Sequence, residues 1–328
     1  MTRRSFIRTC TLLTVSAVTA TMVTPAARAA DAFPSKPISI IVPFSVGGST
    51  DLVARLVATG MSARGTSALV DNRTGGGGVI GWGTAARANA DGYTLLTTEM
   101  SYAIAATLLP KLPFDPYKSF QMVTVAAAMP HVLVVHPSVP AKTVQEFIAL
   151  AKANPGKYYY GSGGNGTNTH LGGALFNSLA GTNLVHVPYR GAGAAMQDLL
   201  GGQVQALITS LPTALAYIKS GKVRALMLAN DTRSPVLPDV PAAPEVGMPK
   251  MVMKFWVGFS VPAGTPQPVI DKLNKEMVET VNTPEVRKSL QDQGLDPVGS
   301  TPAQATKLLN DEIQRWGAVI KAANIKAD

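Results

Sequence analysis

The stretch Ile38-Ser-Ile-Ile-Val-Pro-Phe-Ser-Val-Gly-Gly-Ser-Thr-Asp51 decides the fold class. Its apolar, β-branched start predicts a short strand buried on both faces. Pro43 ends this strand, because a proline cannot donate to a sheet ladder. Gly47 and Gly48 then allow the backbone to turn tightly and to approach a ligand without an intervening side chain.

The end of the same stretch predicts the start of a helix over residues 52–60. Ser49 is the expected N-cap, and Asp51 lies in the electropositive first turn. A strand, a glycine turn and a helix N-terminus favour an anion site, because free backbone N–H groups point outward there. An ordinary strand–helix turn with a capped helix has the same local pattern, so both interpretations stay open.

Residues 1–29 have the pattern of a signal peptide rather than of a folded segment. Arg3, Arg4 and Arg8 form a positive start, and the apolar segment at 12–23 is too short to span a bilayer. Small residues before Ala29 predict cleavage after that position. The paired arginines also match a twin-arginine export signal, and an ordinary secretory signal remains the alternative.

Composition limits the classes of function. The only cysteine, Cys10, lies in the predicted signal, so the predicted mature chain has no disulfide and no cysteine metal ligand. The net charge of +9 includes four arginines before residue 30, and their removal leaves +5. The basic residues are dispersed, which argues against nucleic acid as a partner. About 300 remaining residues suggest one large or two medium domains.

Predicted strands and helices alternate up to residue 108, which indicates an α/β fold with a parallel sheet covered by helices. After Phe120 the pattern changes to two apolar, strand-like runs at 122–128 and 132–135, separated by Met129-Pro-His131. The Pro-rich segment 235–249 suggests an extended crossing between domains. Helices are predicted over 267–282, 284–293 and 302–323.

Two motifs invite an enzymatic interpretation. Gly161-Ser-Gly-Gly-Asn-Gly166 satisfies G-x-G-x-x-G, but no acidic residue that would hold a ribose occurs before Asp198. We therefore expect no dinucleotide cofactor, and the glycine loop remains a candidate anion cradle. Ser162 and His170 form a conceivable nucleophile–base pair that no third residue orients, so catalysis is not favoured. The four histidines lack metal-ligand spacing, and no metal is expected.

Six motifs follow one another along the chain: Pro43-Phe-Ser-Val-Gly-Gly-Ser-Thr-Asp51, Asp91-Gly-Tyr-Thr-Leu-Leu96, Gly161-Ser-Gly-Gly-Asn-Gly-Thr-Asn-Thr-His-Leu171, Val187-Pro-Tyr-Arg-Gly191, Asp198-Leu-Leu-Gly-Gly-Gln-Val204 and Pro262-Ala-Gly-Thr-Pro266. Their order resembles that of the Bug-type periplasmic binding proteins of tripartite tricarboxylate transport systems. The resemblance spans the whole predicted mature chain.

The resemblance implies a two-lobed periplasmic binding protein fold of type II, each lobe a mostly parallel sheet flanked by helices. Residues 30–128 and 247–328 would form the first lobe, and 129–246 the second. It further implies a non-enzymatic periplasmic receptor, monomeric and without cofactor. Such a receptor binds a small carboxylate between its lobes and delivers it to a membrane permease.

The resemblance also assigns a ligand-binding set from both lobes, and it gives Asp198 the role of orienting its neighbouring loop. The expected ligand-binding residues are Pro43, Phe44, Gly47, Gly48, Ser49, Asp51, Thr98, Ser101, Ser162, Gly163, Gly164, Thr167, Asn168, Tyr189 and Ser210.

Glu99 and Trp82 depart from the family pattern, which commonly has small residues there. If Glu99 faces the cleft, its charge would repel a second carboxylate or attract an amine. The ligand therefore stays open among aliphatic dicarboxylates, amino acids, and aromatic or nicotinate-like acids. Two other functions remain as alternatives: an exported hydrolase-like enzyme, and a ligand sensor for a signalling partner.

Overall fold

Two mixed β-sheets share one long strand, β4, in the computed structural model, which describes residues 33–109 and 111–326. In the first sheet the strand order is β2-β1-β3-β9-β4, with β10 beside β4. β1 pairs in parallel with β2 and β3, and the remaining pairs are antiparallel. These strands are β1 (Ile38–Val42), β2 (Ala68–Asn72), β3 (Thr94–Glu99), β4 (Phe120–Val135), β9 (Lys254–Pro262) and β10 (Asp296–Pro297).

The second sheet begins where β4 leaves the first one. The last five residues of β4 pair antiparallel with β7 and β8, and β5 pairs in parallel with β6 and β7. Its other strands are β5 (Tyr159–Ser162), β6 (Val185–Pro188), β7 (Ala206–Ser210) and β8 (Arg224–Ala229). We call the first sheet with its helices lobe 1 and the second lobe 2. The two-lobed α/β class is confirmed, but the sheets are mixed rather than mostly parallel: β2-β1-β3 and β6-β5-β7 are parallel, and all pairs of β4 and β9 are antiparallel.

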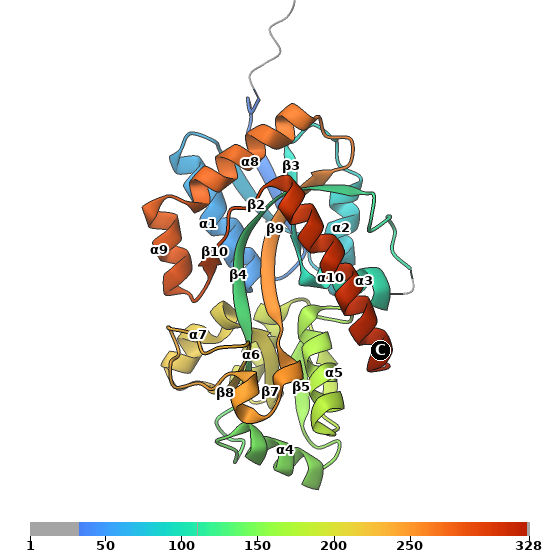
Figure 1. Cartoon of the computed structure of the whole chain (residues 1–328), viewed down its shortest axis with the longest axis vertical. Helices are drawn as coiled ribbons and strands as arrows, with labels where there is room; N and C mark the ends of the chain where they lie inside the picture. The colour runs from blue at the N-terminus through green and yellow to red at the C-terminus, as the bar shows by residue number, and fades with distance from the viewer. Residues whose placement is uncertain (1–32, 110, 327–328) are drawn as a thin grey trace, which may run out of the picture. The chain divides into compact units, whose positions relative to one another are not determined.

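Helices surround each sheet, and β4 and β9 run between the two groups (Figure 1). Lobe 1 contains α1 (Ser49–Ala63), α2 (Val79–Ala86), α3 (Met100–Leu108), α8 (Gln267–Val281), α9 (Pro284–Asp292) and α10 (Pro302–Ala322). Lobe 2 contains α4 (Val144–Ala153), α5 (Asn168–Ala180), α6 (Ala192–Leu200) and α7 (Leu211–Lys219). Short 3₁₀ turns lie at η1 (Gly76–Gly78), η2 (Ala243–Val246) and η3 (Pro249–Met251). Within the described residues, no helix combines the length and apolar character that a membrane span requires.

The predicted break at Met129-Pro-His131 is wrong, because β4 continues through it. Pro130 is opposite Lys254, where the pairing with β9 ends. His131 already pairs with Ser210 of β7 and with β8. The missing N–H of Pro130 therefore falls between two ladders, where it removes little pairing. A local proline signal was overridden by strand partners that are distant in sequence.

The Pro-rich segment was predicted as an extended crossing, but it packs along β8 instead. Leu228 and Ala242 form a parallel bridge, and the segment contains η2 and the start of η3. The amide of Met253 still bonds to Ala229 in lobe 2, and β9 starts at the next residue. The strand pairing thus returns to lobe 1 at Lys254, while the lobe limits predicted from sequence stay a prediction.

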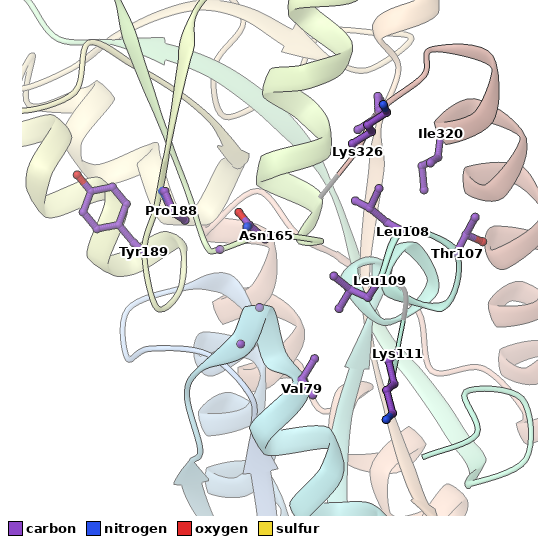
Figure 2. A pocket seen from close by; sticks show the side chains of 14 residues that line it. Val79, Thr107, Leu108, Leu109, Lys111, Asn165, Pro188, Tyr189, Ile320 and Lys326 are labelled. Carbon is purple, nitrogen blue, oxygen red and sulfur yellow. The ribbon is translucent and has the colours of Figure 1, made fainter. Parts of the chain in front are cut away.

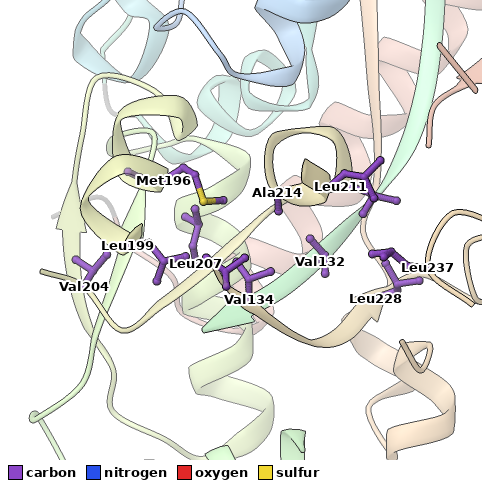
Figure 3. Packing of buried hydrophobic residues seen from close by; sticks show 13 residues of the cluster. Val132, Val134, Met196, Leu199, Val204, Leu207, Leu211, Ala214, Leu228 and Leu237 are labelled. Atoms are coloured by element: carbon purple, nitrogen blue, oxygen red, sulfur yellow. The ribbon is translucent and has the colours of Figure 1, made fainter. Parts of the chain in front are cut away.

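The core of lobe 2 explains why its inner elements hold their positions. Met196 and Leu199 of α6 pack on Leu207 of β7 and Val134 of β4 (Figure 3). All four side chains are at most 1% exposed. Burying a large apolar side chain contributes about 1.5–3 kcal/mol. The ends of α6 and β7 that face lobe 1 are therefore rigidly supported.

Candidate functional site

The loop between β1 and α1 is held by Asp51, which is only 3% exposed. Its Oδ2 accepts a hydrogen bond from the Gly47 amide at 3.1 Å, and its Oδ1 accepts one from Asn72 Nδ2 at 2.9 Å. Arg55 also bonds to both carboxylate oxygens. Gly47 has a φ of +85°, which favours glycine. Asp51 thus fixes the loop, and its charge is already paired.

The N-cap of α1 is Gly48, and no side chain caps this helix. The prediction that Ser49 caps it is wrong, because Ser49 is its first helical residue. The Ser49 hydroxyl instead bonds across the lobes, to the Ser210 hydroxyl and to Thr213 Oγ1 at 3.1 Å. The first amides of α1 therefore have no side-chain cap, and that helix end is electropositive.

A small inter-lobe cavity of about 30 Å³ lies at this helix end. Neither Lys nor Arg is among the described residues that line it, so hydroxyl, amide and backbone groups supply its polarity. Its walls are Phe44, Gly48, Ser49, Thr50, Ser101, Gly163, Thr167, Asn168, Thr169, Ala192, Ser210 and Phe255. Eight of the fifteen predicted ligand-binding residues are therefore brought together: Phe44, Gly48, Ser49, Ser101, Gly163, Thr167, Asn168 and Ser210.

The glycine loop after β5 is stabilised by its own hydroxyl groups. The amide of Gly163 donates to Thr169 Oγ1 at 2.7 Å, and that of Gly164 donates to Ser162 Oγ at 3.0 Å. Thr167 caps α5 and donates to the Gly164 carbonyl at 2.6 Å. The two glycine amides thus have partners inside the loop, and the hydroxyl and amide side chains beside them face the cavity.

Asn168, the first residue of α5, connects the lobes. The backbone N of Asn168 donates to Ser101 Oγ at 3.0 Å, and the side-chain Nδ2 donates to the same oxygen at 2.9 Å. Nδ2 also lies 3.2 Å from Glu99 Oε2, and Oδ1 lies 2.9 Å from His131 Nε2. Glu99 is fully buried, and burial raises its pKa from 4.5 to about 7 despite the hydrogen bonds from Ser101 and Asn168.

The two departures from the family pattern can now be placed. Glu99 lies behind the cavity wall, bonded to the wall residues Ser101 and Asn168. Trp82 is fully buried and packs edge-on against Phe44, with ring centroids 6.3 Å apart, and against Tyr102 at 5.4 Å. Trp82 does not line the cavity; it supports Phe44, which does.

A second hollow, the outer groove, has a volume of about 850 Å³ (Figure 2). Two predicted residues, Gly164 and Tyr189, line this groove and not the cavity. The Tyr189 hydroxyl donates to Asp198 Oδ2 at 2.7 Å, a contact consistent with the loop-orienting role implied for Asp198. Burial is the largest cause that raises the pKa of Tyr189, and the hydrogen bond to the charged Asp198 raises it further. Gly163 lines the cavity, and the next residue, Gly164, lines the groove.

The remaining predicted residues lie behind these surfaces. Pro43 packs on Gly81, where a β-carbon would be 2.7 Å from the Pro43 Cα. Thr98 bonds to Ser260 Oγ at 2.6 Å within the first sheet. Ser162 is fully buried, and its hydroxyl bonds to His186 Nε2 at 2.5 Å rather than to His170. The suggested Ser162–His170 pair is therefore wrong. The described residues contain no group of three metal-ligating side chains.

Four cavity residues are absent from the predicted ligand-binding set. Thr50 and Thr169 lie within the loop motifs that the sequence singles out at the two helix starts, and Thr169 is a candidate donor of the glycine-loop anion cradle. Ala192 follows the Val187–Gly191 motif, and Phe255 begins the returning strand β9. Their role depends on how the lobes meet, which no local pattern encodes.

A main-chain contact closes one side of the cavity. The Ser45 amide donates to the Arg190 carbonyl at 3.2 Å across the lobes. A β-carbon on Gly191 would lie 2.7 Å from Ser45 N, and one on Gly193 would lie 2.5 Å from the Val46 carbonyl oxygen. The backbones therefore approach more closely than any side chain would permit.

A site with walls from both lobes is typical of solute-binding proteins. Comparison with known proteins places the chain in such a family. Residues 53–325 match the family described as tripartite tricarboxylate transporter family receptor. The chain belongs to this family. It is 38% identical over 300 residues to Protein BugT of Bordetella pertussis, and the matched region covers 90% of this chain and 92% of BugT.

Two solved structures have closely similar folds. MatC from Rhodopseudomonas palustris with bound malate is 33% identical, with a TM-score of 0.85 over 88% of this chain and all of that one. Rpa4515 from R. palustris with adipate is 31% identical, with a TM-score of 0.86 over 90% of this chain and 99% of that one.

Proposed function

We propose that this receptor binds a small carboxylate between its lobes and delivers it unchanged to the membrane permease of a tripartite transporter. The observation that carries the proposal is the inter-lobe cavity, where the uncapped N-terminus of α1 meets Ser210 and Asn168 of lobe 2. Neither lobe alone provides a complete site, so a bound ligand stabilises the contact between them.

The chemistry of the cavity favours an anion. The electropositive end of α1 and the hydroxyls of Ser49, Thr50 and Ser210 suit a carboxylate without a lysine or arginine partner. The structurally similar proteins MatC and Rpa4515 were solved with malate and adipate, which are both carboxylates.

The size of the cavity requires the lobes to move. A volume of about 30 Å³ is one water molecule's share of the liquid. Ligand sites generally have about 300–1,000 Å³. We therefore infer that the lobes separate to admit the ligand, that the bound ligand keeps the cavity wider than it is in this structure, and that β4 and β9, which run between the lobes, act as the hinge.

A thermal-shift screen of malate, adipate and a wider set of carboxylic acids tests the proposal. A ligand at about 100 times its dissociation constant stabilises the protein by about 2.7 kcal/mol. The neutral amide of each active acid is the matched control, and we expect it to bind at least about tenfold more weakly, since hydrogen bonds to a charged group contribute about 1.5–3 kcal/mol. Equal binding of acid and amide would contradict the anion site.

The same samples test the enzymatic alternative. A receptor returns the acid unchanged after prolonged incubation, whereas a hydrolase releases a product that chromatography detects. Export through residues 1–29, with cleavage after Ala29, and a monomeric state complete the proposal; residues 1–29 lie outside the described part of the chain. Mass analysis of secreted protein and light scattering test these two points.

A further inference from the structure

Donor and acceptor requirements at Asn168 show that the lobe contact needs a proton. His131 Nδ1 lies 3.1 Å from the Met253 carbonyl oxygen, which only accepts hydrogen bonds. Nδ1 therefore carries hydrogen. His131 Nε2 faces Asn168 Oδ1, also an acceptor, so in this arrangement Nε2 must carry a second hydrogen and His131 is an imidazolium.

In the alternative arrangement the side-chain amide of Asn168 is rotated by half a turn, so that Oδ1 and Nδ2 exchange places. The NH₂ group then donates to a neutral His131, and the amide oxygen faces Ser101 Oγ and Glu99 Oε2. Ser101 can donate through its hydroxyl, but Glu99 can donate only when protonated. Both arrangements therefore satisfy every contact with one proton, placed on His131 in the first and on Glu99 in the second.

Loss of that proton leaves a repulsive contact in either arrangement. With a neutral His131 and an ionised Glu99, one end of the Asn168 amide faces another acceptor. The contact is fully buried at Glu99 and His131, and water does not relieve it. When the lobes separate, Glu99 and Asn168 part and each gains water as a partner.

We propose that one proton shared by Glu99 and His131 secures Asn168 across the lobes, so that closure takes up a proton from solvent. We call Glu99, Asn168 and His131 the proton latch. This proposal rests on the proposed function in one respect, namely that the lobes open and close. No carboxylate ligand is needed to test it.

Other charged groups do not replace this proton. The titratable residues on neighbouring elements are Asp51 and Arg55 of α1, Tyr102 of α3, Tyr159 and Tyr160 of β5, His170 of α5, His186 of β6, Tyr217 and Lys219 of α7, Arg224 of β8, Lys250 of η3, Lys254 of β9, Asp271, Lys272, Lys275, Glu276 and Glu279 of α8, Asp296 of β10, and Lys307, Asp311, Glu312, Arg315 and Lys321 of α10. None of them forms a hydrogen bond or ion pair with Glu99 or His131 in the described structure. Burial lowers the pKa of His131 and raises that of Glu99, which favours the proton on Glu99.

The direction of the pH effect follows from Glu99. Its pKa in the closed arrangement, about 7, exceeds the ordinary 4.5 that it approaches when exposed. The stabilisation of closure is therefore complete below about pH 4.5 and is lost as the pH rises through about 7. The closed fraction should fall across this window.

Distance measurements between two spin labels test the proposal without a ligand. In a Cys10→Ser background, the exposed Lys219 of α7 and Lys288 of α9 are changed to Cys; these helices lie on one side of the two lobes (Figure 1). We expect the closed fraction to fall at least threefold between pH 5.5 and pH 8. A single, pH-independent distance distribution, open or closed, would overturn the proposal.

Two variants identify the proton, and a third is the control. In Glu99→Gln no group at position 99 can lose a proton; the new amide can donate to Asn168 but cannot accept from the Ser101 amide, and that loss is the same at every pH. The closed fraction of Glu99→Gln should therefore be equal at pH 5.5 and pH 8. In His131→Gln the new amide replaces the imidazolium donor, but Glu99 stays buried and titratable, so the fall with pH should be smaller than in the parent and not abolished. Glu312→Gln alters another buried carboxylate, which bonds to Trp316 and not to the latch, and it should follow the parent.

A fall with pH that persists in Glu99→Gln, or that is unchanged in His131→Gln, would refute the latch. Melting curves establish that each variant is folded. If Glu99→Gln does not fold, His131→Gln carries the test, because it removes the contact between two acceptors and leaves only the burial of Glu99. A screen that finds no carboxylate would contradict the proposed function but would leave this result unaffected.

Discussion

Two of the contacts between the lobes are of opposite construction. At the glycine contact, the backbone at Ser45–Gly48 touches the backbone at Arg190–Gly193, and no side-chain donor is involved. At the proton latch, side chains dominate the contact: the carboxamide of Asn168 bonds to Glu99 and Ser101, and its backbone N also donates to Ser101. The first contact depends on the absence of side chains, and the second on a carboxamide between two titratable groups.

This difference separates the geometry of closure from its control. The glycine contact sets how closely the lobes approach and has no group that titrates. The proton latch contributes little to the distance of approach, but its donors and acceptors match only with a proton present. Substitutions at the first should change affinity at every pH, whereas substitutions at the second should change the shape of the pH profile.

The largest effect is expected from Gly193→Ala. Its β-carbon would lie 2.5 Å from the Val46 carbonyl oxygen, so the lobes cannot reach the observed contact. Overpacking of this kind costs about 1–3 kcal/mol. Calorimetric titration with malate, or with the acid that the screen selects, should therefore show affinity reduced about tenfold to a hundredfold.

Folding should be unaffected by Gly193→Ala, because the residue lies in α6 and alanine favours a helix. Gly201→Ala at the other end of the same helix is the matched control. Its β-carbon would have no neighbour closer than 3.6 Å, and we expect wild-type affinity. Unchanged affinity in Gly193→Ala would show that the glycine contact is not part of the bound form.

An intermediate effect is expected from Ser210→Ala. Its hydroxyl bonds to Ser49 across the lobes and to Thr213 within lobe 2. A neutral hydrogen bond contributes about 0.5–1.5 kcal/mol, so affinity should fall about twofold to tenfold in the same titration. The loss should be the same at pH 5.5 and pH 8, in contrast to that of the proton latch.

The neighbouring residue offers a control for Ser210→Ala. Thr209 is fully buried, and its hydroxyl has no hydrogen-bond partner in the described structure. Thr209→Val keeps the shape of the side chain and should leave affinity unchanged, with equal or higher thermal stability. A loss in Thr209→Val as large as that in Ser210→Ala would mean that β7 acts through packing and not through the hydroxyl of Ser210.

Local signals were sufficient for most helix starts. Thr143 caps α4 by accepting a hydrogen bond from Glu146 N, and a threonine three residues before a glutamate is the local pattern of such a helix start. Pro284 and Pro302 stand at the first positions of α9 and α10, where the missing N–H removes no helical bond. These features depend on residues within one turn of each other, so sequence alone determines them.

Signals that depend on distant partners were not sufficient. Pro130 predicts a break, but the partners on β9 and β7 carry the strand through it. Asp51 suits a helix start, yet only the fold shows that Gly47, Asn72 and Arg55 occupy its carboxylate. Glu99 was ambiguous for the same reason, since its partner Asn168 belongs to the other lobe.

The smallest effects should distinguish the two glycines of the first loop. Gly47 has a φ of +85°, and no atom lies within 4 Å of the position that a β-carbon would take there, so its requirement is conformational. Gly48 has no such φ, and its β-carbon would lie 3.7 Å from Ser45 O and 3.9 Å from Gly193 N, beside the cavity. One glycine therefore serves the turn, and the other serves the approach of lobe 2.

Gly47→Ala should lower the free energy of unfolding by about 1–2 kcal/mol, the cost of a left-handed residue with a β-carbon. The folded fraction should bind malate, or the selected acid, within about twofold of wild type. Gly48→Ala should melt as wild type does, yet bind about twofold to threefold more weakly, because ordinary van der Waals contacts leave closure possible while the cavity narrows. Melting curves and titrations of both variants decide the assignment. The reverse pattern, with Gly48→Ala unstable and Gly47→Ala defective in binding, would mean that the turn itself forms the ligand site.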